Sequence, residues 1–296
     1  MTEEQENDYV TADDILIWTL RKEELSDIDE TYAMRILADE LRRHHVKTPI
    51  IDRTHRQAQR NKDVREAMKA ARSRLREVYG AFKQVSLGKV DLLLDALQRD
   101  PDSQTIHREI LSLHQSTKER LDHYAEMYQS IWNVTGTPRR ILDLGCGLNP
   151  IAYPSMGCRP HYVANEVSEA YCAAIRRYFK IGGIEGEAFS YDLTSFTANQ
   201  STTFLKSDVC LMLKIVDTLE TVSRNSAWRL IEGIPSTWFV VSFPTTSLGG
   251  MKTIPDRRRA WFENMLKHHN ITPTTFHIPH EQFYVFANPK TITTNT

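Results

Sequence analysis

Residues 141–150, with the sequence ILDLGCGLNP, restrict the fold of this chain more than any other segment. The first four residues have the apolar character of a buried strand, and Asp143 is their only charged member. Gly145 and Gly147 then allow a tight turn and a close approach of the backbone to a ligand, because neither carries a Cβ. Pro150 suits the first position of a helix. A strand, a glycine turn and a helix in this order are typical of nucleotide-binding α/β folds.

Acidic residues near this turn indicate which nucleotide is bound. A dinucleotide fingerprint needs a third glycine where this chain has Pro150, whereas Asp143 before the turn favours S-adenosylmethionine. Glu166 follows the next expected strand and can accept hydrogen bonds from ribose hydroxyls, although a helix N-terminal residue is the simpler interpretation of Glu166 alone. Asp192 follows the third strand and is placed to meet the adenine amino group. We therefore predict an S-adenosylmethionine site at the carboxyl ends of three successive strands.

The second half of the chain has the pattern of a parallel α/β sheet. From Arg140, β-branched and aliphatic runs alternate with helical stretches. We expect strands at 140–144, 161–165, 186–190, 207–214, 236–243, 273–278 and 281–288, and helices at 168–181, 217–231 and 255–269. The close spacing of the last two strands predicts an antiparallel hairpin at the sheet edge. This is the fold of class I S-adenosylmethionine-dependent methyltransferases, Rossmann-like with a mainly parallel seven-stranded sheet.

The first half of the chain is patterned as helices with no convincing strand. We predict an N-terminal all-α domain over residues 1–111, which would bind RNA, and a methyltransferase domain over residues 112–296. No apolar run approaches the roughly 20 residues of a membrane helix, and the acidic N-terminus lacks a secretory signal. The four cysteines include no Cys-x-x-Cys pair, so neither a disulfide framework nor a zinc site is indicated. We expect a cytoplasmic protein with no metal and no membrane association.

Several motifs resemble the aminoglycoside-resistance 16S ribosomal RNA guanine-N7 methyltransferases of the Arm/Rmt type. The resemblance covers residues 63–286 in one order. It rests on LSLHQSTKERL at 111–121, GCGLNP at 145–150, Lys214 with Leu219-Glu220, VSFP at 241–244, SLGG at 247–250 and WFE at 261–263. It implies transfer of a methyl group from S-adenosylmethionine to a guanine N7 in the decoding site. The implied partner is 16S rRNA in the assembled small ribosomal subunit, bound by a monomeric enzyme that can confer aminoglycoside resistance.

The resemblance also implies roles for individual residues. Arg120 would clamp the methionine carboxylate of the cofactor, which suits a bidentate guanidinium. Lys214 would stand at the active-site rim as the catalytic residue, although a snorkelling lysine or a salt bridge to Asp217 or Glu220 is an alternative. The full set of implied cofactor contacts is Arg120, Asp143, Gly145, Gly147, Glu166, Asp192, Leu213 and Lys214.

The missing motifs favour methylation of a ring nitrogen. Exocyclic amino methylation usually needs an Asn/Asp-Pro-Pro-aromatic segment where this chain has Lys214-Ile215-Val216, and cytosine C5 methylation needs a placed cysteine. Guanine N7 already carries an exposed lone pair, so alignment with the methyl donor is sufficient. The chain departs from the family at Thr246, where a basic residue is usual. A different small-subunit rRNA base, or a cofactor-binding assembly factor without turnover, therefore remains open.

The charge distribution indicates where RNA would bind. The net charge is only −1, but residues 47–90 contain 12 Lys+Arg against 4 Asp+Glu, a local balance of +8. Residues 63–79 have helical periodicity. Their apolar residues form one stripe along the helix, and their basic residues form a second stripe about 60° wide. We predict that this stripe binds phosphates, although a solvated charged face is the alternative. The expected RNA-binding residues are Arg65, Lys69, Arg72 and Arg76, with a second patch at Arg257 and Arg258.

Overall fold

The computed structural model describes residues 9–22, 25, 28, 30–51, 54–80, 87–197, 204–247 and 253–292. Residues 248–252, which include part of the SLGG motif, therefore lie outside the described residues. The chain divides into two compact units, Met1–Ala81 and Phe82–Thr296. The two helices that follow residue 86 belong to the second unit, where they contact each other and the helices formed by residues 149–156 and 169–181.

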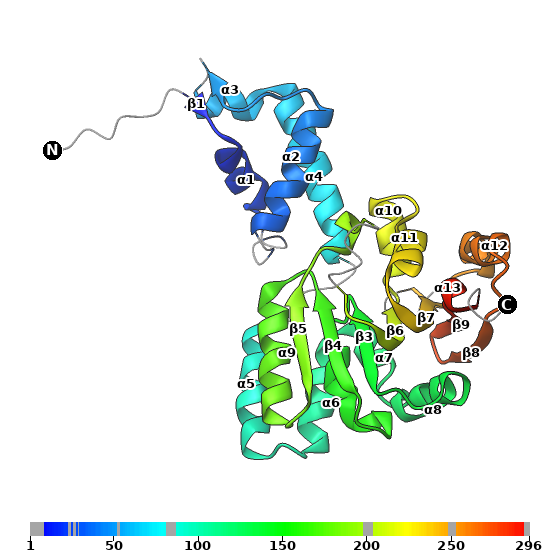
Figure 1. Cartoon of the computed structure of the whole chain (residues 1–296). Coiled ribbons are helices and arrows are strands. Elements are labelled where there is room, and N and C mark those ends of the chain that lie inside the picture. The colour runs from blue at the N-terminus through cyan, green and yellow to red at the C-terminus, as the bar shows by residue number, and fades with distance from the viewer. Residues whose placement is uncertain are drawn as a thin grey trace. The chain divides into compact units, whose positions relative to one another are not determined.

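The described residues of the first unit form four helices, labelled in Figure 1, and one small strand pair. The helices are α1 (Ala12–Leu20), α2 (Glu30–Arg43), α3 (His55–Arg60) and α4 (Lys62–Gly80). Strands β1 (Tyr9–Val10) and β2 (Ile50–Ile51) pair antiparallel, which the helical pattern of this region did not predict. Helix α4 contacts the other three helices, and its apolar stripe is buried as expected at Val64, Ala67, Met68, Ala71 and Leu75.

The second unit contains a seven-stranded sheet in the order β5-β4-β3-β6-β7-β9-β8. The strands from β5 to β7 are parallel, and β9 pairs antiparallel with both β7 and β8. This confirms the predicted class I methyltransferase fold. The bounds are β3 (Arg140–Leu144), β4 (His161–Glu166), β5 (Gly186–Ser190), β6 (Ser207–Leu213), β7 (Ser236–Pro244), β8 (Thr274–Ile278) and β9 (Glu281–Ala287).

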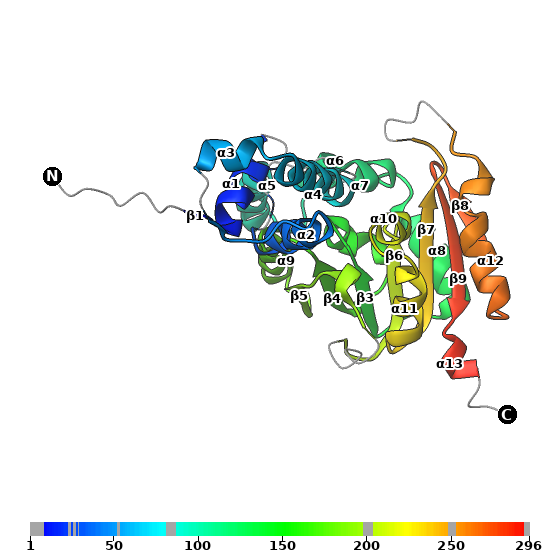
Figure 2. The same cartoon turned by 90° about the horizontal axis from the view of Figure 1, so that it is seen from above.

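Helices cover both faces of this sheet. Alternate side chains of each strand point to opposite faces, so Ile141 packs with α5, α6, α8, α9 and η2, whereas Leu142 packs with η3, α10, α11 and α12. Figure 2 shows α12 beside the β8–β9 edge. The bounds are α5 (Leu87–Arg99), α6 (Gln104–Leu113), α7 (Gln115–Glu119), α8 (Tyr124–Thr135), η2 (Asn149–Met156), α9 (Glu169–Ile181), η3 (Leu193–Ser195), α10 (Val216–Val222), α11 (Ser226–Gly233), η5 (Asp256–Arg258), α12 (Ala260–His268) and α13 (Pro289–Ile292).

Local backbone chemistry changes three of the predicted helices. The helix expected at 217–231 is two helices, because Ser223 is extended and Asn225 has a φ of 63°. The helix expected at 255–269 begins as the 3-10 turn η5. The segment opened by Pro150 is the 3-10 helix η2 rather than an α-helix. Among the described residues, no helix is long and apolar enough to cross a membrane.

Candidate active site

The glycine turn lies directly after β3, as the sequence predicts. Gly145 and Gly147 have φ values of 59° and 52°, in the left-handed region that favours glycine. A Cβ added to Gly145 would lie 3.0 Å from the Ile215 side chain, so space as well as backbone conformation restricts this position. The turn therefore has the close-approach geometry that a bound nucleoside requires.

Asp143 lies buried beneath this turn. One carboxylate oxygen, Oδ2, accepts hydrogen bonds from the Tyr162 hydroxyl at 2.6 Å and the Asn149 amide at 2.9 Å. The other oxygen, Oδ1, is buried without a hydrogen-bond partner, as is Asn149 Oδ1. Burial raises the pKa of Asp143 to about 6, although Tyr162 and Asn149 act in the opposite direction. Two orphaned acceptors at one position suit a cationic donor, because an unsatisfied buried acceptor is costly.

Glu166 is the last residue of β4, and it joins the glycine turn to the segment that leads into α9. Its carboxylate accepts hydrogen bonds from the backbone N–H groups of Gly147 at 3.3 Å, Val167 at 2.6 Å and Ser168 at 3.4 Å. Burial raises the pKa of Glu166, and these three N–H groups oppose that shift. A carboxylate has about four acceptor sites, so about one remains for a ligand hydroxyl. Asp192 follows β5 and caps η3 through the Thr194 backbone N–H at 2.8 Å.

Arg120 is buried, with only 2% of its surface exposed, which excludes a helix-surface arginine. It makes a bidentate pair with Glu281 at the start of β9, through Nε to Oε2 at 2.8 Å and Nη2 to Oε1 at 2.7 Å. The Ser242 hydroxyl donates to the same carboxylate at 2.5 Å. Burial alone would raise the pKa of Glu281, but Arg120 and Lys214 outweigh it and hold that pKa below its usual value.

Lys214 follows β6 and has a left-handed backbone conformation, with a φ of 59°. Its ammonium donates to Glu119 Oε2 at 2.7 Å and lies 3.3 Å from Glu281 Oε2. The salt bridge considered for Lys214 with Asp217 or Glu220 is therefore wrong, because two other carboxylates hold the ammonium. Two cations and two carboxylates thus form one internally neutral group, the charged cluster of Arg120, Lys214, Glu119 and Glu281. Leu213, the last residue of β6, is buried beside it.

His114 lies next to the charged cluster and is 4% exposed. Its Nδ1 is 2.8 Å from the Ser116 hydroxyl, and its Cε1 would lie 3.8 Å from a Cβ on Gly147. Burial, assisted by the charges of Arg120 and Lys214, lowers the pKa of His114 to about 4. The imidazole is therefore neutral near pH 7 and adds no charge to a site that already contains two cations.

Comparison with protein families identifies the chain. A family model described as ribosomal RNA methyltransferase (FmrO) matches residues 42–275. The chain belongs to this family. Curated relatives include the 16S rRNA (guanine(1405)-N(7))-methyltransferase of Micromonospora echinospora, 34% identical over 210 residues, or 68% of this chain and 73% of the relative. The protein of the same name from Serratia marcescens is 31% identical over 214 residues, or 70% of this chain and 77% of the relative.

Solved structures of two 16S rRNA methylases confirm the family resemblance that the motifs indicated. The 16S rRNA methyltransferase RmtF, in complex with S-adenosyl-L-homocysteine, aligns over 97% of this chain and 99% of its own, with a TM-score of 0.74 and 25% identity. The 16S rRNA methylase RmtB aligns over 94% of this chain and 99% of its own, with a TM-score of 0.71 and 25% identity. The family and its fold therefore agree with the interpretation of the sequence.

The residues of this family member fit S-adenosylmethionine. The orphaned Asp143 Oδ1 suits an α-ammonium group, and Glu166 suits a ribose. Glu281 uses two of the five N–H donors of Arg120, so the guanidinium keeps donors for a carboxylate. When bound, this cofactor supplies an electrophilic methyl group on a sulfonium. Within the described residues there is no group of three or more His, Cys, Asp or Glu side chains that could hold a metal ion.

The predicted RNA-binding stripe on α4 is only partly exposed to solvent. Arg65, Lys69 and Arg76 are exposed as expected. Arg72 is different, because its guanidinium donates to the backbone carbonyls of Thr19 at 3.0 Å and Trp18 at 2.6 Å, at the end of α1. The expectation that Arg72 faces phosphate must be corrected: these contacts satisfy carbonyls at a helix C-terminus. In the second unit, Arg257 and Arg258 are exposed on η5.

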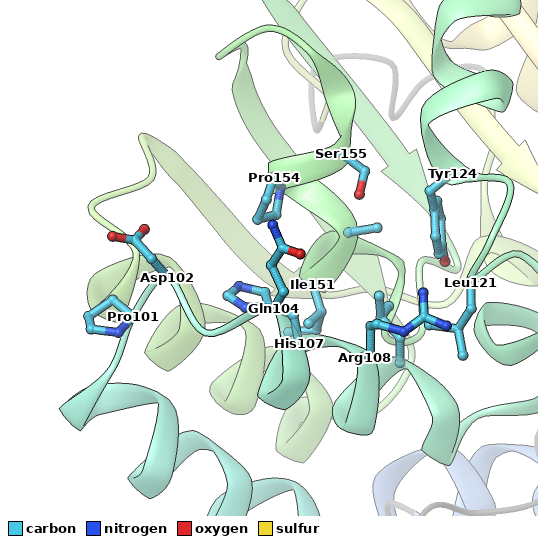
Figure 3. Close-up of a pocket in the computed structure, with 12 residues that line it drawn as sticks. Pro101, Asp102, Gln104, His107, Arg108, Leu121, Tyr124, Ile151, Pro154 and Ser155 are labelled. Atoms are coloured by element: carbon cyan, nitrogen blue, oxygen red, sulfur yellow. The ribbon is translucent and has the colours of Figure 1, made fainter.

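A cavity of about 460 Å³ lies beside η2 but contains no predicted catalytic or cofactor-binding residue (Figure 3). Pro101 and Asp102 lie at one end of this cavity, and Leu121 and Tyr124 lie at the other. Its one arginine, Arg108, already pairs with Asp122 at 2.8 Å. None of the residues that line this cavity belongs to the charged cluster or to the glycine turn, but Tyr124, at one end of the cavity, interacts electrostatically with Arg120 of the cluster.

Sequence reasoning missed Glu281, Glu119 and His114 as site residues. Glu119 and His114 lie inside the recognised motif, but nothing local distinguishes them from a helix surface. Glu281 is the only charged residue in β9, which is otherwise mainly apolar. A single carboxylate at the start of an apolar strand could have indicated a site residue, because a buried charge normally needs a partner of opposite charge.

Proposed function

We propose that this protein transfers a methyl group from S-adenosylmethionine to N7 of a guanine in 16S rRNA. The proposed nucleotide is the one that the names of the curated relatives give, guanine 1405. The proposed substrate particle is the assembled 30S subunit, acted on in the cytoplasm by a monomer. Modification of the decoding site would confer resistance to aminoglycosides.

The observation that carries this proposal is the placement of Lys214 in the charged cluster. Its amino group is held by ion pairs with the carboxylates of Glu119 and Glu281, which fix its position at the end of β6. His114 is neutral but buried. A site arranged in this way orients groups rather than deprotonating them, and guanine N7 needs orientation only. We assign Lys214 to placing the base and to shaping the local electric field.

Nucleoside analysis of the product tests this proposal. Purified protein, 30S subunits from an unmodified strain and labelled S-adenosylmethionine are incubated, and the rRNA is digested to nucleosides for mass spectrometry. The expected product is N7-methylguanosine, at about one methyl group per subunit. Label in another nucleoside would contradict the proposal and would favour a different rRNA base, with Thr246 as the first position to examine. Binding of cofactor without any label in RNA would favour an assembly factor.

A further inference from the structure

A groove of about 1200 Å³ lies in the catalytic unit between α10 and α11 on one side and η5 and α12 on the other. The groove begins near Lys214, to which we assign placement of the target base. Asp217 on α10 lies three residues after Lys214 and lines the groove. Of the residues that line it, only Arg258 has a role assigned above, as part of the basic patch predicted to bind RNA. Its lining combines two tryptophans, two histidines and three arginines, a composition that differs from the mainly apolar core beneath it.

The aromatic side chains of the groove present flat surfaces. Trp228 stacks on His269 with ring centroids 3.4 Å apart and an interplanar angle of 8°. Trp261 is fixed by its indole N–H, which donates to Asp217 at 3.3 Å, and by edge contacts with Phe243 and Phe262. Rigid aromatic faces of this kind stack nucleic-acid bases with little dependence on sequence.

The acidic residues of the groove are used within the protein. Both oxygens of Glu220 accept backbone N–H groups, from Asn225 and Ala227, each at 2.9 Å. Asp217 accepts the Trp261 indole, and burial raises its pKa. Glu220 therefore caps α11, and Asp217 positions an aromatic ring.

The arginines of the groove remain available to an anion. Arg224 and Arg258 are exposed, and within the described residues neither side chain has a salt bridge, although the charge of Arg258 acts on nearby Asp217 and opposes the pKa rise that burial causes there. The Arg229 guanidinium is fixed by the hydroxyls of Ser223 at 2.8 Å and Ser226 at 3.1 Å, while its Nε is buried without a hydrogen-bond partner. Guanidinium groups beside aromatic faces match the phosphate and base of a single nucleotide.

We propose that this groove binds an unpaired nucleotide of the rRNA that flanks the methylated guanine. The inference rests on the proposed function for the identity of the RNA. A base extends the stack that Trp228 and His269 form, and Arg224 and Arg258 contact the adjoining phosphates. The groove would thus hold the strand after the target base leaves its helix.

The test uses the double variant Arg224→Ala/Arg258→Ala in the full-length protein. We expect KM for 30S subunits to rise about tenfold, with kcat and cofactor affinity unchanged. The dependence of binding on log salt should become shallower by about two, because each phosphate contact releases about one counterion. The matched control is Arg159→Ala/Lys180→Ala, which removes two exposed cations of the same unit outside the groove and should leave KM within about twofold.

A second variant tests stacking separately from charge. Trp228→Ala should weaken binding of a naked single-stranded RNA around guanine 1405 about tenfold in a filter assay, and Trp228→Phe should restore most of the affinity. Wild-type KM and salt dependence in the arginine variant would overturn the proposal. A defect seen with 30S subunits but not with naked RNA would also overturn it, in favour of a ribosomal protein contact. The wild-type product nucleoside, measured in parallel, reports separately on the proposed function.

Discussion

The charged cluster of the catalytic unit and the basic face of α4 use the same side-chain types in opposite ways. In the cluster, Arg120 is 2% exposed and Glu281 is 0% exposed, and each charge is neutralised by another. On α4, Arg65 and Lys69 are exposed to solvent. Buried charges must be paired, and the pairing fixes their geometry, whereas exposed cations can bind phosphate. Of these two regions, only the basic face of α4 can therefore contribute affinity for RNA. The paired charges of the cluster instead hold groups of the active site in a fixed orientation.

The largest effect is expected from breaking the cluster at Glu281. Glu281→Gln leaves Arg120 and Lys214 without a shared carboxylate, and removing one partner of a buried pair costs about 3–5 kcal/mol. Urea denaturation should report this loss in the free energy of unfolding. The matched control is Glu187→Gln, which breaks the exposed pair with Arg140 and should cost at most about 1 kcal/mol. Equal losses in the two variants would show that burial does not distinguish these pairs.

The next effect concerns cofactor binding by Arg120. Arg120→Lys keeps a positive charge but loses the bidentate geometry, so the affinity for S-adenosylmethionine should fall by about 2–4 kcal/mol. Isothermal titration measures this loss, after circular dichroism has established that the variant is folded. Wild-type affinity in a folded variant would restrict Arg120 to a structural pair with Glu281.

Reversal of the exposed stripe should affect the substrate and not the cofactor. Arg65→Glu/Lys69→Glu/Arg76→Glu should lower kcat/KM for 30S subunits at least about 100-fold, or about 2.7 kcal/mol. Cofactor affinity should not change, because these residues belong to the first unit. The control is Arg72→Gln, which should lower stability through the lost α1 contacts without abolishing methylation. Full activity of the triple variant would mean that the stripe is a solvated face.

A smaller effect on the free energy of unfolding is expected from protonation of His114 as the pH is lowered. The folded-state pKa is about 4, below the unfolded value of 6.5, so the unfolded chain takes up the proton first as pH falls. This contribution to stability is complete above pH 6.5 and is lost as pH falls toward 4. Between pH 7.5 and 5 it amounts to about 2 kcal/mol. His114→Gln should lose that part of the pH dependence, whereas His277→Gln, at an exposed position, should retain it. Identical pH profiles for wild type and His114→Gln would contradict this assignment.

The cofactor site, the charged cluster and α4 differ in how much of each could be predicted from the sequence. The glycine turn and Glu166 were predictable because each lies at the end of a strand whose pattern is local. The pair of Arg120 with Glu281 joins residues 161 positions apart, and no local pattern contains it. On α4, periodicity placed Arg72 with Lys69 correctly on one side of the helix. It could not show that α1 ends beside Arg72, because that contact belongs to tertiary packing.

The helix break before α11 illustrates the same limit. Apolar periodicity favoured one helix over 217–231, but the Glu220 carboxylate caps a new helix start through the N–H groups of Asn225 and Ala227. A side chain that competes for backbone donors can end a helix that the pattern would continue. That break also helps to form the groove between α11 and α12.

Chemical cleavage at the methylated nucleotide tests the central claim most directly. N7 methylation gives guanine a positive charge, so borohydride reduction followed by aniline cuts the RNA at that nucleotide. Primer extension on 16S rRNA from treated 30S subunits should show one new stop, at guanine 1405, only when protein and S-adenosylmethionine are both present. Methyl label in the rRNA without any cleavage would contradict N7 as the target atom, and cleavage at another guanine would contradict the proposed position.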